Sequence, residues 1–252
     1  MIEREVLADG IVIVRLAHGK ANVLDLELLE SLEQAIDHLR DPGIRAAVLT
    51  GRDAIFCAGV DLFRVSDGGA EYLSRFLPAL RRALHALFTL EKPVVAAANG
   101  HAIAGGALLL LACDYRMMAE GGGRVGVPEL RVGVPFPAIA LEILRGVLPP
   151  AQFARMIYRG ETFEGEQLER FGIVDERVPS AELRERAIAR ARELAGIPAA
   201  TFAITKRQLR APVCEAYRAL GESFDREVDH LWGSEPVREA MRGYLQRTLK
   251  KS

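Results

Sequence analysis

The sequence predicts an α/β fold in which buried strands and helices alternate, followed by a C-terminal region that is almost wholly helical. Two observations support this prediction. Runs of small or branched apolar residues at 44–50 and 93–98 are typical of strands buried on both faces, and each leads into a glycine-bearing turn. Beyond residue 149 the apolar residues instead recur with helical spacing, interrupted at 172–179, where a short strand is expected.

The first forty residues predict a hairpin and then a helix. β-rich runs at 3–7 and 11–16 are separated by Asp9-Gly10, a pair that favours the positive φ angles of tight hairpin turns. Asp25 is a candidate N-cap for a helix over 25–40, which Asp41-Pro42-Gly43 ends. The apolar stripe of this helix comprises Leu28, Leu29, Leu32, Ile36 and Leu39.

Later elements continue the alternation of strand, turn and helix. Helical periodicity predicts a helix over 72–90 and a buried helix over 105–112, which precedes the run 114–118. The helices expected in the C-terminal region are 151–158, 165–171, 181–195, 198–209, 213–231 and 236–250.

Composition excludes several classes of protein. The charges of the 33 basic and 34 acidic residues nearly cancel, and the two kinds are interleaved along the sequence. We therefore expect no strongly positive surface potential that would favour nucleic acid or an anionic membrane as a partner. The three cysteines show no disulfide or zinc spacing and are expected to be reduced, which predicts a cytoplasmic protein. No signal-peptide pattern opens the chain, and its apolar runs are too short to cross a bilayer.

Three segments could carry chemistry. In 56–62, small residues around Gly59 form a turn whose backbone N–H groups could approach an anion, although such a turn is often only a tight loop. In 99–107, Gly105 and Gly106 open an apolar helix, and the free N–H groups could receive an oxyanion or merely allow close packing. Glu129 follows a strand-like run and lies between apolar residues, so burial could raise its pKa into a range useful for a general base. His101 has no sequence neighbour suited to catalysis and is interpreted as structural.

Seven segments in this order resemble the landmarks of the crotonase (enoyl-CoA hydratase/isomerase) superfamily. They are 20–24, 49–51 with 56–62, 99–106, 113–116, 126–129, 171–175 and 205–206. The resemblance implies a spiral core of stacked ββα units over 1–195 and a C-terminal helical trimerisation region over 196–252. It also implies an acyl-CoA thioester substrate, homotrimers or dimers of trimers, and no separate cofactor or metal.

The resemblance also assigns roles to individual positions. The backbone N–H groups of Val60 and Gly105 match the oxyanion hole that holds the thioester oxygen, and Glu129 matches a catalytic carboxylate. The positions that match substrate contacts, most of them made through backbone, are Lys20, Ala21, Val23, Ala58, Asp61, Leu62, Gly106, Leu108 and Pro128.

One expected carboxylate is missing. Hydratases of this superfamily usually place a second glutamate on the helix after the glycines, and that position is Leu108 here. The pattern therefore resembles monofunctional 3-enoyl-CoA isomerases, in which one glutamate moves a proton from C2 to C4. The tail around Trp232 and over 241–247 is also similar to theirs, and the acyl pocket is expected to draw on 64–77 and on the tail helices.

Two alternatives remain open. The first is a hydratase, decarboxylase or thioester hydrolase whose further base comes from Asp61, Glu71 or the C-terminal region. The second is a non-catalytic acyl-CoA-binding or RNA-associated scaffold, against which the intact Glu129 and the absence of a basic patch argue.

Overall fold

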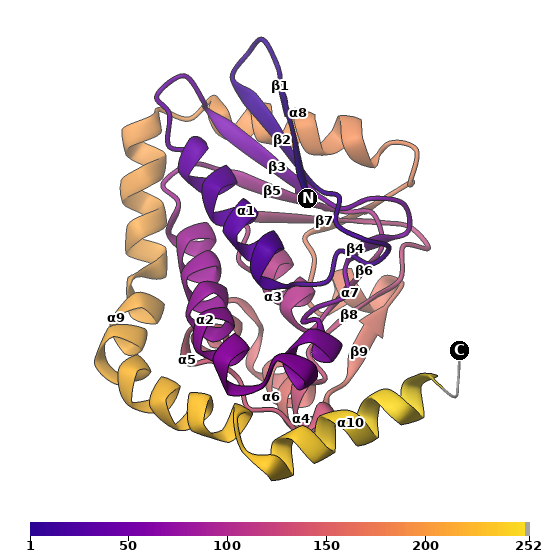
Figure 1. The fold of residues 1–252 in the computed structure, drawn as a ribbon. Coiled ribbons are helices and arrows are strands. Elements are labelled where there is room, and N and C mark those ends of the chain that lie inside the picture. Colours follow the sequence, from indigo (N-terminus) through magenta and orange to yellow (C-terminus); the bar gives the residue numbers. More distant parts are fainter. Residues whose placement is uncertain (250–252) are drawn as a thin grey trace.

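The computed structural model describes residues 1–249 and contains two β-sheets surrounded by helices (Figure 1). The larger sheet has the order β1-β2-β3-β5-β7-β10, and only its β1–β2 hairpin is antiparallel. Its strands are β1 (Ile2–Val6), β2 (Ile11–Leu16), β3 (Ala46–Thr50), β5 (Val94–Ala98), β7 (Tyr115–Ala119) and β10 (Glu176–Val178). The smaller sheet contains β4 (Ile55–Cys57), β6 (His101–Ile103), β8 (Arg124–Gly126) and β9 (Thr162–Glu164).

The chain winds through the two sheets as a spiral. Each turn passes one strand through the larger sheet and one through the smaller sheet, and then enters a helix. The three turns are β3–β4–α2, β5–β6–α3 and β7–β8–α4, with α2 at Leu62–Thr89, α3 at Gly105–Leu111 and α4 at Glu129–Val132. This arrangement confirms the predicted α/β class with stacked ββα units.

The N-terminal helix forms as its sequence predicts. Helix α1 spans Leu26–His38, and the Asp25 side chain caps it by accepting a hydrogen bond from the Leu28 N–H. All five residues of the predicted apolar stripe are buried. Helix α2 begins ten residues before the predicted start at 72, because Asp61 caps it at Leu62, and Gly69 interrupts it with a φ of 57°. The glycine pair and polar residues of that first segment hide its helical period.

The C-terminal half adds six further helices among the described residues. They are α5 (Ala138–Val147), α6 (Pro150–Arg159), α7 (Glu166–Arg170), α8 (Leu183–Ala195), α9 (Ala199–Trp232) and α10 (Glu235–Leu249). The predicted helices 198–209 and 213–231 are one continuous helix, α9, with Pro212 inside it. Proline removes one backbone donor but does not end this helix, which changes direction along its length (Figure 1).

The described part of the chain ends before the last predicted helical residue, Lys250. The predicted domain boundary after residue 195 falls at the junction of α8 and α9 and stays a prediction.

Both faces of the larger sheet are buried. Because side chains alternate along a strand, Val12 and Val14 enter the main core, which includes residues of α1, α2, α3 and α5. Ile11 and Ile13 point the other way and pack in a smaller core beneath α8. Across residues 1–249, no helix has both the length and the apolar character needed to span a bilayer.

Candidate active site

The three segments with predicted chemistry lie side by side because β4, β6 and β8 are parallel neighbours. Ile55 pairs with His101, and Ala102 and Ile103 pair with Val125 and Gly126. The turns that follow these strands therefore emerge at one edge of the smaller sheet. The Ala104 N–H donates to the Gly126 carbonyl over 2.8 Å and ties the second turn to the third.

The first two turns touch through glycine. A Cβ atom added to Gly59, whose φ is +89°, would lie 2.7 Å from the Ala104 Cβ and 3.3 Å from the Gly105 nitrogen. Ala104 itself has a φ of 52° and a ψ of −125°, a conformation that L residues rarely adopt. This strained residue places the Gly105 N–H at the start of α3.

Two backbone N–H groups at this contact are free to bind an anion. Val60 and Gly105 both line the same cavity, and within residues 1–249 neither amide donates to another part of the chain. Gly105 is the first residue of α3, so its N–H has no partner within the helix. The structure thus brings the two predicted oxyanion-hole residues together.

A third strip of chain runs along the first turn. The Ala58 N–H donates to the Ala21 carbonyl over 3.0 Å, and the Leu24 N–H donates to the Gly59 carbonyl over 2.7 Å. Asn22, buried and with a φ of 49°, donates from its side chain to the Phe56 carbonyl over 3.1 Å. Asn22 therefore fixes this strip beside the oxyanion turn, a role that sequence reasoning missed.

Glu129 supplies the carboxyl group of the cavity. It is the first residue of α4 and is 8% exposed, and its Oε2 atom has no hydrogen-bond partner among the described residues. Burial raises the pKa of Glu129 to about 8, because the apolar surroundings destabilise the charged form, and its own backbone N–H offsets only part of this effect. A carboxyl group in this state can accept and return a proton near neutral pH.

The cavity around Glu129 has a volume of about 90 Å³ and is mainly apolar. Glu129 is the one carboxylate among the described residues that line it. Leu108, in α3, also lines it and is 2% exposed. Asp61, named above as a possible further base, caps α2 by accepting from the Arg64 N–H, and Glu71 lies on the exposed side of α2. Neither lines the cavity.

The predicted site residues fall into two groups. Those that line the cavity are Ala58, Val60, Leu62, Gly105, Leu108, Pro128 and Glu129. Those that do not are Lys20, Ala21, Val23, Asp61 and Gly106. A Cβ atom on Gly106 would lie 2.1 Å from the Cys57 carbonyl oxygen, so this glycine lets α3 approach β4. Lys20, Ala21 and Val23 lie on the strip beside the oxyanion turn, and their contact with CoA stays a prediction.

The C-terminal helices contribute side chains to the cavity, as the sequence indicates. Trp232 ends α9 and Tyr244 lies in α10, and both line the cavity. The sequence also predicts that 64–77 lines the acyl pocket, but no residue of this segment lines the cavity. Helix α2 contributes Leu62 and Leu80 instead. Further lining residues that sequence reasoning missed are Ile103, Ala104, Val132, Val134 and Pro137.

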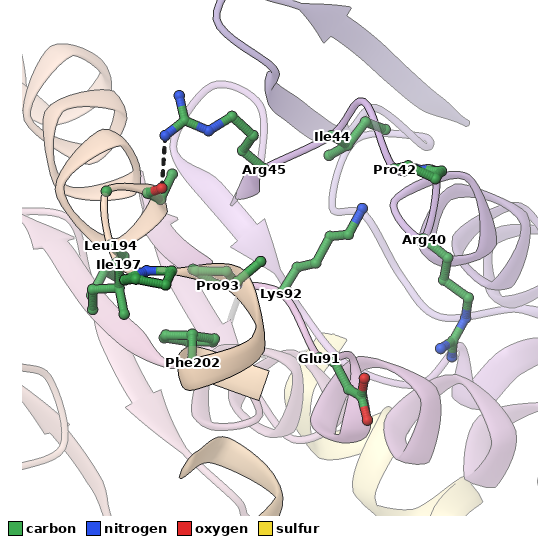
Figure 2. A pocket seen from close by; sticks show the side chains of 14 residues that line it. Arg40, Pro42, Ile44, Arg45, Glu91, Lys92, Pro93, Leu194, Ile197 and Phe202 are labelled. Carbon is green, nitrogen blue, oxygen red and sulfur yellow. Dashed lines mark hydrogen bonds between the residues drawn. The ribbon is translucent and has the colours of Figure 1, made fainter. Parts of the chain in front are cut away.

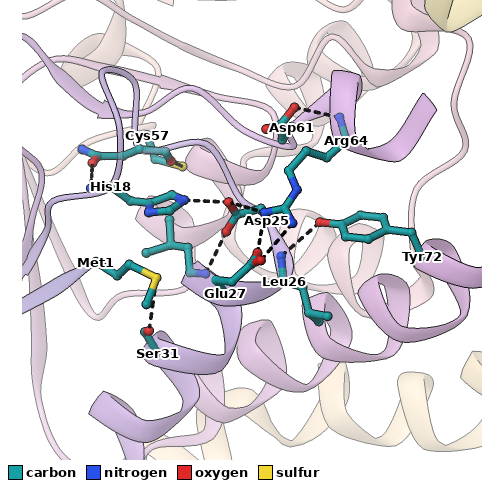
Figure 3. A network of polar contacts seen from close by, with 12 residues as sticks. Met1, His18, Asp25, Leu26, Glu27, Ser31, Cys57, Asp61, Arg64 and Tyr72 are labelled. Atoms are coloured by element: carbon teal, nitrogen blue, oxygen red, sulfur yellow. Dashed lines mark hydrogen bonds and ion pairs between the residues drawn. The ribbon is translucent and has the colours of Figure 1, made fainter. Parts of the chain in front are cut away.

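A polar network holds the first turn of α2 against α1 (Figure 3). The buried Asp25 accepts from Arg64 over 3.1 Å and lies 2.6 Å from the His18 Nε2. Arg64 also pairs with Glu27, and the Tyr72 hydroxyl accepts from the Leu26 N–H over 3.1 Å. This network fixes the segment that begins at Leu62, although its members are far apart in sequence.

A larger cavity of about 540 Å³ lies elsewhere, between residues 40–45, 91–93 and the α8–α9 junction (Figure 2). Its side chains Arg40, Arg45 and Lys92 point in different directions, and no predicted site residue lines it. His101 is exposed and accepts from the Arg124 N–H, in agreement with its structural interpretation.

The geometry defines a class of enzyme site. Two free N–H groups can stabilise negative charge on a carbonyl oxygen while a desolvated carboxylate removes the proton next to that carbonyl. Enolate chemistry of this kind suits acyl thioesters, because their α-proton is too weakly acidic to remove at neutral pH unless the developing charge is stabilised. No group of His, Cys, Asp and Glu side chains within 1–249 is arranged to hold a metal ion.

Comparison with known proteins identifies the family. The family model described as enoyl-CoA hydratase/isomerase matches residues 7–250, so the chain belongs to this family of the crotonase superfamily and is an enzyme of that kind. A Thermus thermophilus protein, provisionally named enoyl-CoA hydratase, is 38% identical over 196 residues, covering 76% of this chain and 77% of the relative. The carnitinyl-CoA dehydratase of Salmonella typhi is 31% identical over 240 residues, which cover 93% of this chain and 91% of that relative.

A solved structure shows the same fold over its full length. The human mitochondrial delta3-delta2-enoyl-CoA isomerase matches with a TM-score of 0.94, covering 100% of this chain and 99% of that chain at 23% identity. The fold is therefore that of the crotonase superfamily, including the C-terminal helices.

Proposed function

We propose that this enzyme is an isomerase that converts 3-enoyl-CoA thioesters to trans-2-enoyl-CoA thioesters, without a separate cofactor. One observation carries the proposal: among the described residues of the cavity, Glu129 is the one carboxylate, and Leu108 shares the cavity with it. Addition of water to a double bond needs groups that orient the water and deliver a proton, and a leucine side chain does neither. Moving a proton within one substrate needs a single base.

The proposed reaction uses three groups of the chain. The Glu129 carboxylate removes a proton from C2, and the electron pair moves into the thioester to form a dienolate. The Val60 and Gly105 N–H groups stabilise the negative oxygen, a contribution worth several kcal/mol for such donors. The protonated Glu129 then delivers its proton to C4, which leaves the double bond between C2 and C3. Apolar residues such as Leu108 keep water from the dienolate.

We further propose that the CoA nucleotide lies along Lys20, Ala21 and Val23, since this strip borders the oxyanion turn through the Ala58–Ala21 hydrogen bond. We also retain the proposal of a homotrimer or a dimer of trimers. Several large apolar side chains of α9 are exposed in the single chain and could pack against other copies; they are Ile204, Leu209, Leu220, Phe224 and Leu231.

The reaction is tested by following the appearance of the conjugated 2-enoyl thioester from 3-enoyl-CoA substrates, together with mass analysis of the product. Isomerisation leaves the mass unchanged, whereas hydration adds one water. We expect Glu129→Gln to lower kcat/KM by about 10²- to 10⁴-fold, since the amide cannot accept the proton. For the wild type, kcat/KM should rise about tenfold per pH unit as the pH approaches 8, because the carboxylate is the minor form below that pKa.

Control variants and opposite outcomes make this test decisive. Glu71→Gln changes an exposed carboxylate outside the cavity and should retain wild-type turnover. A hydrated product from the wild type, or full activity of Glu129→Gln, would refute the isomerase proposal.

A further inference from the structure

The cavity next to Glu129 is small for an acyl-CoA site. An engineered apolar cavity of about 150 Å³ holds one benzene molecule, which has six carbons. By that measure, the cavity volume of about 90 Å³ corresponds to roughly four carbons. A thioester whose oxygen lies at Val60 and Gly105 would therefore fill this space with its first few acyl carbons.

Trp232 forms a fixed part of the cavity wall. It is 2% exposed, and its indole Nε1–H donates to the Pro135 carbonyl over 2.9 Å. This hydrogen bond and the surrounding core hold the ring in one position, because moving it would leave a buried donor without a partner. The indole therefore cannot swing aside for a longer chain at low cost.

Tyr244 adds a second aromatic wall from α10, and α10 is closely docked. A Cβ atom on Gly133, at the end of α4, would lie 2.6 Å from the Ala240 Cβ, so the helix approaches the α4 backbone directly. Met241, the next residue, is fully buried. The docked helix thus fixes the backbone position of Tyr244, and its partly buried ring packs against the main core.

We propose that Trp232 and Tyr244 are specificity-determining residues that restrict the substrate to short acyl chains of about four to six carbons. This inference rests on the proposed function for the placement of the acyl group beside Glu129. The two walls come from the last turn of α9 and from α10, and the remaining lining of the cavity is supplied mainly by the spiral core. The C-terminal helices therefore limit the length of the acyl chain, and residues of the spiral core perform the chemistry.

The test measures binding of saturated acyl-CoAs, which have no double bond to move. Kd is determined by calorimetry for butyryl-, hexanoyl-, octanoyl- and decanoyl-CoA. A methylene that is accommodated strengthens binding about fourfold. We expect wild-type affinity to stop rising by hexanoyl-CoA, and octanoyl-CoA to bind at least about tenfold more weakly than butyryl-CoA.

Two variants should move this limit. Tyr244→Ala removes a whole phenol group and should restore octanoyl-CoA binding to at least the affinity for butyryl-CoA. Trp232→Phe keeps an aromatic ring in the core, so it should fold, and should shift the optimum by one or two carbons. Tyr158→Ala is the matched control, because Tyr158 is 78% exposed and does not line the cavity.

The outcomes separate this inference from the isomerase proposal. Wild-type affinity that keeps rising through decanoyl-CoA overturns the chain-length limit, as does a limit that Tyr244→Ala leaves unchanged. Failure of 3-enoyl-CoA turnover, combined with the expected binding series, would refute isomerisation while supporting the limit on chain length.

Discussion

Glu129 makes the stability of the protein depend on pH. Its folded-state pKa of about 8 lies above its ordinary value of 4.5, so between these pH values the folded protein keeps a proton that the unfolded chain releases. The contribution of Glu129 to the stability of the folded wild type is therefore fully present below pH 4.5, and it is lost as the pH rises towards 8. Within this pH window, we expect the free energy of unfolding of Glu129→Gln to rise relative to that of the wild type by about 1.4 kcal/mol per pH unit.

Urea denaturation at about pH 5, 6, 7 and 8 measures this difference in the free energy of unfolding. Glu30→Gln is the control, because Glu30 is exposed on α1, and its difference from the wild type should stay nearly constant. If the Glu129→Gln and wild-type stabilities run parallel over the whole range, the carboxyl group is not desolvated as the structure indicates.

At the scale of the element, the contact between the turns after β4 and β6 determines the oxyanion hole. Gly59→Ala would insert a methyl group against the Ala104 Cβ and the Ile103 carbonyl, both 2.7 Å away. We expect this change to separate the Val60 and Gly105 N–H groups, and to lower kcat by about 10²- to 10³-fold. The strain should also destabilise the fold by about 1–3 kcal/mol.

A second glycine separates crowding from backbone strain. Gly121 has a φ of +69°, but a Cβ atom there meets nothing within 4 Å, so Gly121→Ala tests strain alone. It should lose some stability and keep kcat. Equal loss of kcat in both variants would show that contact between the two turns is not what positions the donors.

The same elements show what the sequence could and could not predict. The sequence predicts the turns at Gly59, Gly105 and Glu129, because glycine spacing and an isolated carboxylate are local signals. The strands that bring them together, β4, β6 and β8, have three residues each, too few for a hydrophobic period to be visible. Their pairing was therefore implied by family resemblance rather than by local pattern.

The C-terminal helices show a second limit of sequence reasoning. The sequence predicts separate helices over 198–209 and 213–231, but α9 continues through Pro212 as one helix, because tertiary packing overrides local propensity. The extent to which Trp232 and Tyr244 enclose the cavity depends on how α9 and α10 dock against the core. Residues that come together only on folding have no characteristic spacing in the sequence, so the sequence pattern does not predict their contact. The tail pattern pointed to these helices, but it did not give the shape of the cavity.

At the scale of the whole molecule, α9 is attached to the larger sheet by a buried ion cluster. Asp114, just before β7, accepts from Lys206 and from Arg210, both over 2.6 Å, and its side chain also accepts from the Val94 N–H. Burial lowers the pKa of Lys206 to about 8, and the Asp114 charge opposes that effect. One carboxylate thus compensates two buried cations at the start of the helix that ends at Trp232.

Neutralising that carboxylate should weaken the docking of the whole C-terminal region. Asp114→Asn keeps the shape of the side chain but leaves Lys206 and Arg210 as adjacent buried cations, so we expect a loss of about 3–5 kcal/mol in the free energy of unfolding. Urea denaturation measures this loss, and Glu222→Gln, which breaks an exposed pair on the same helix, should change stability little. Because α9 carries Trp232, loosened docking should also weaken the discrimination between butyryl- and octanoyl-CoA. An Asp114→Asn protein with wild-type stability would show that the cluster does not hold α9 to the core.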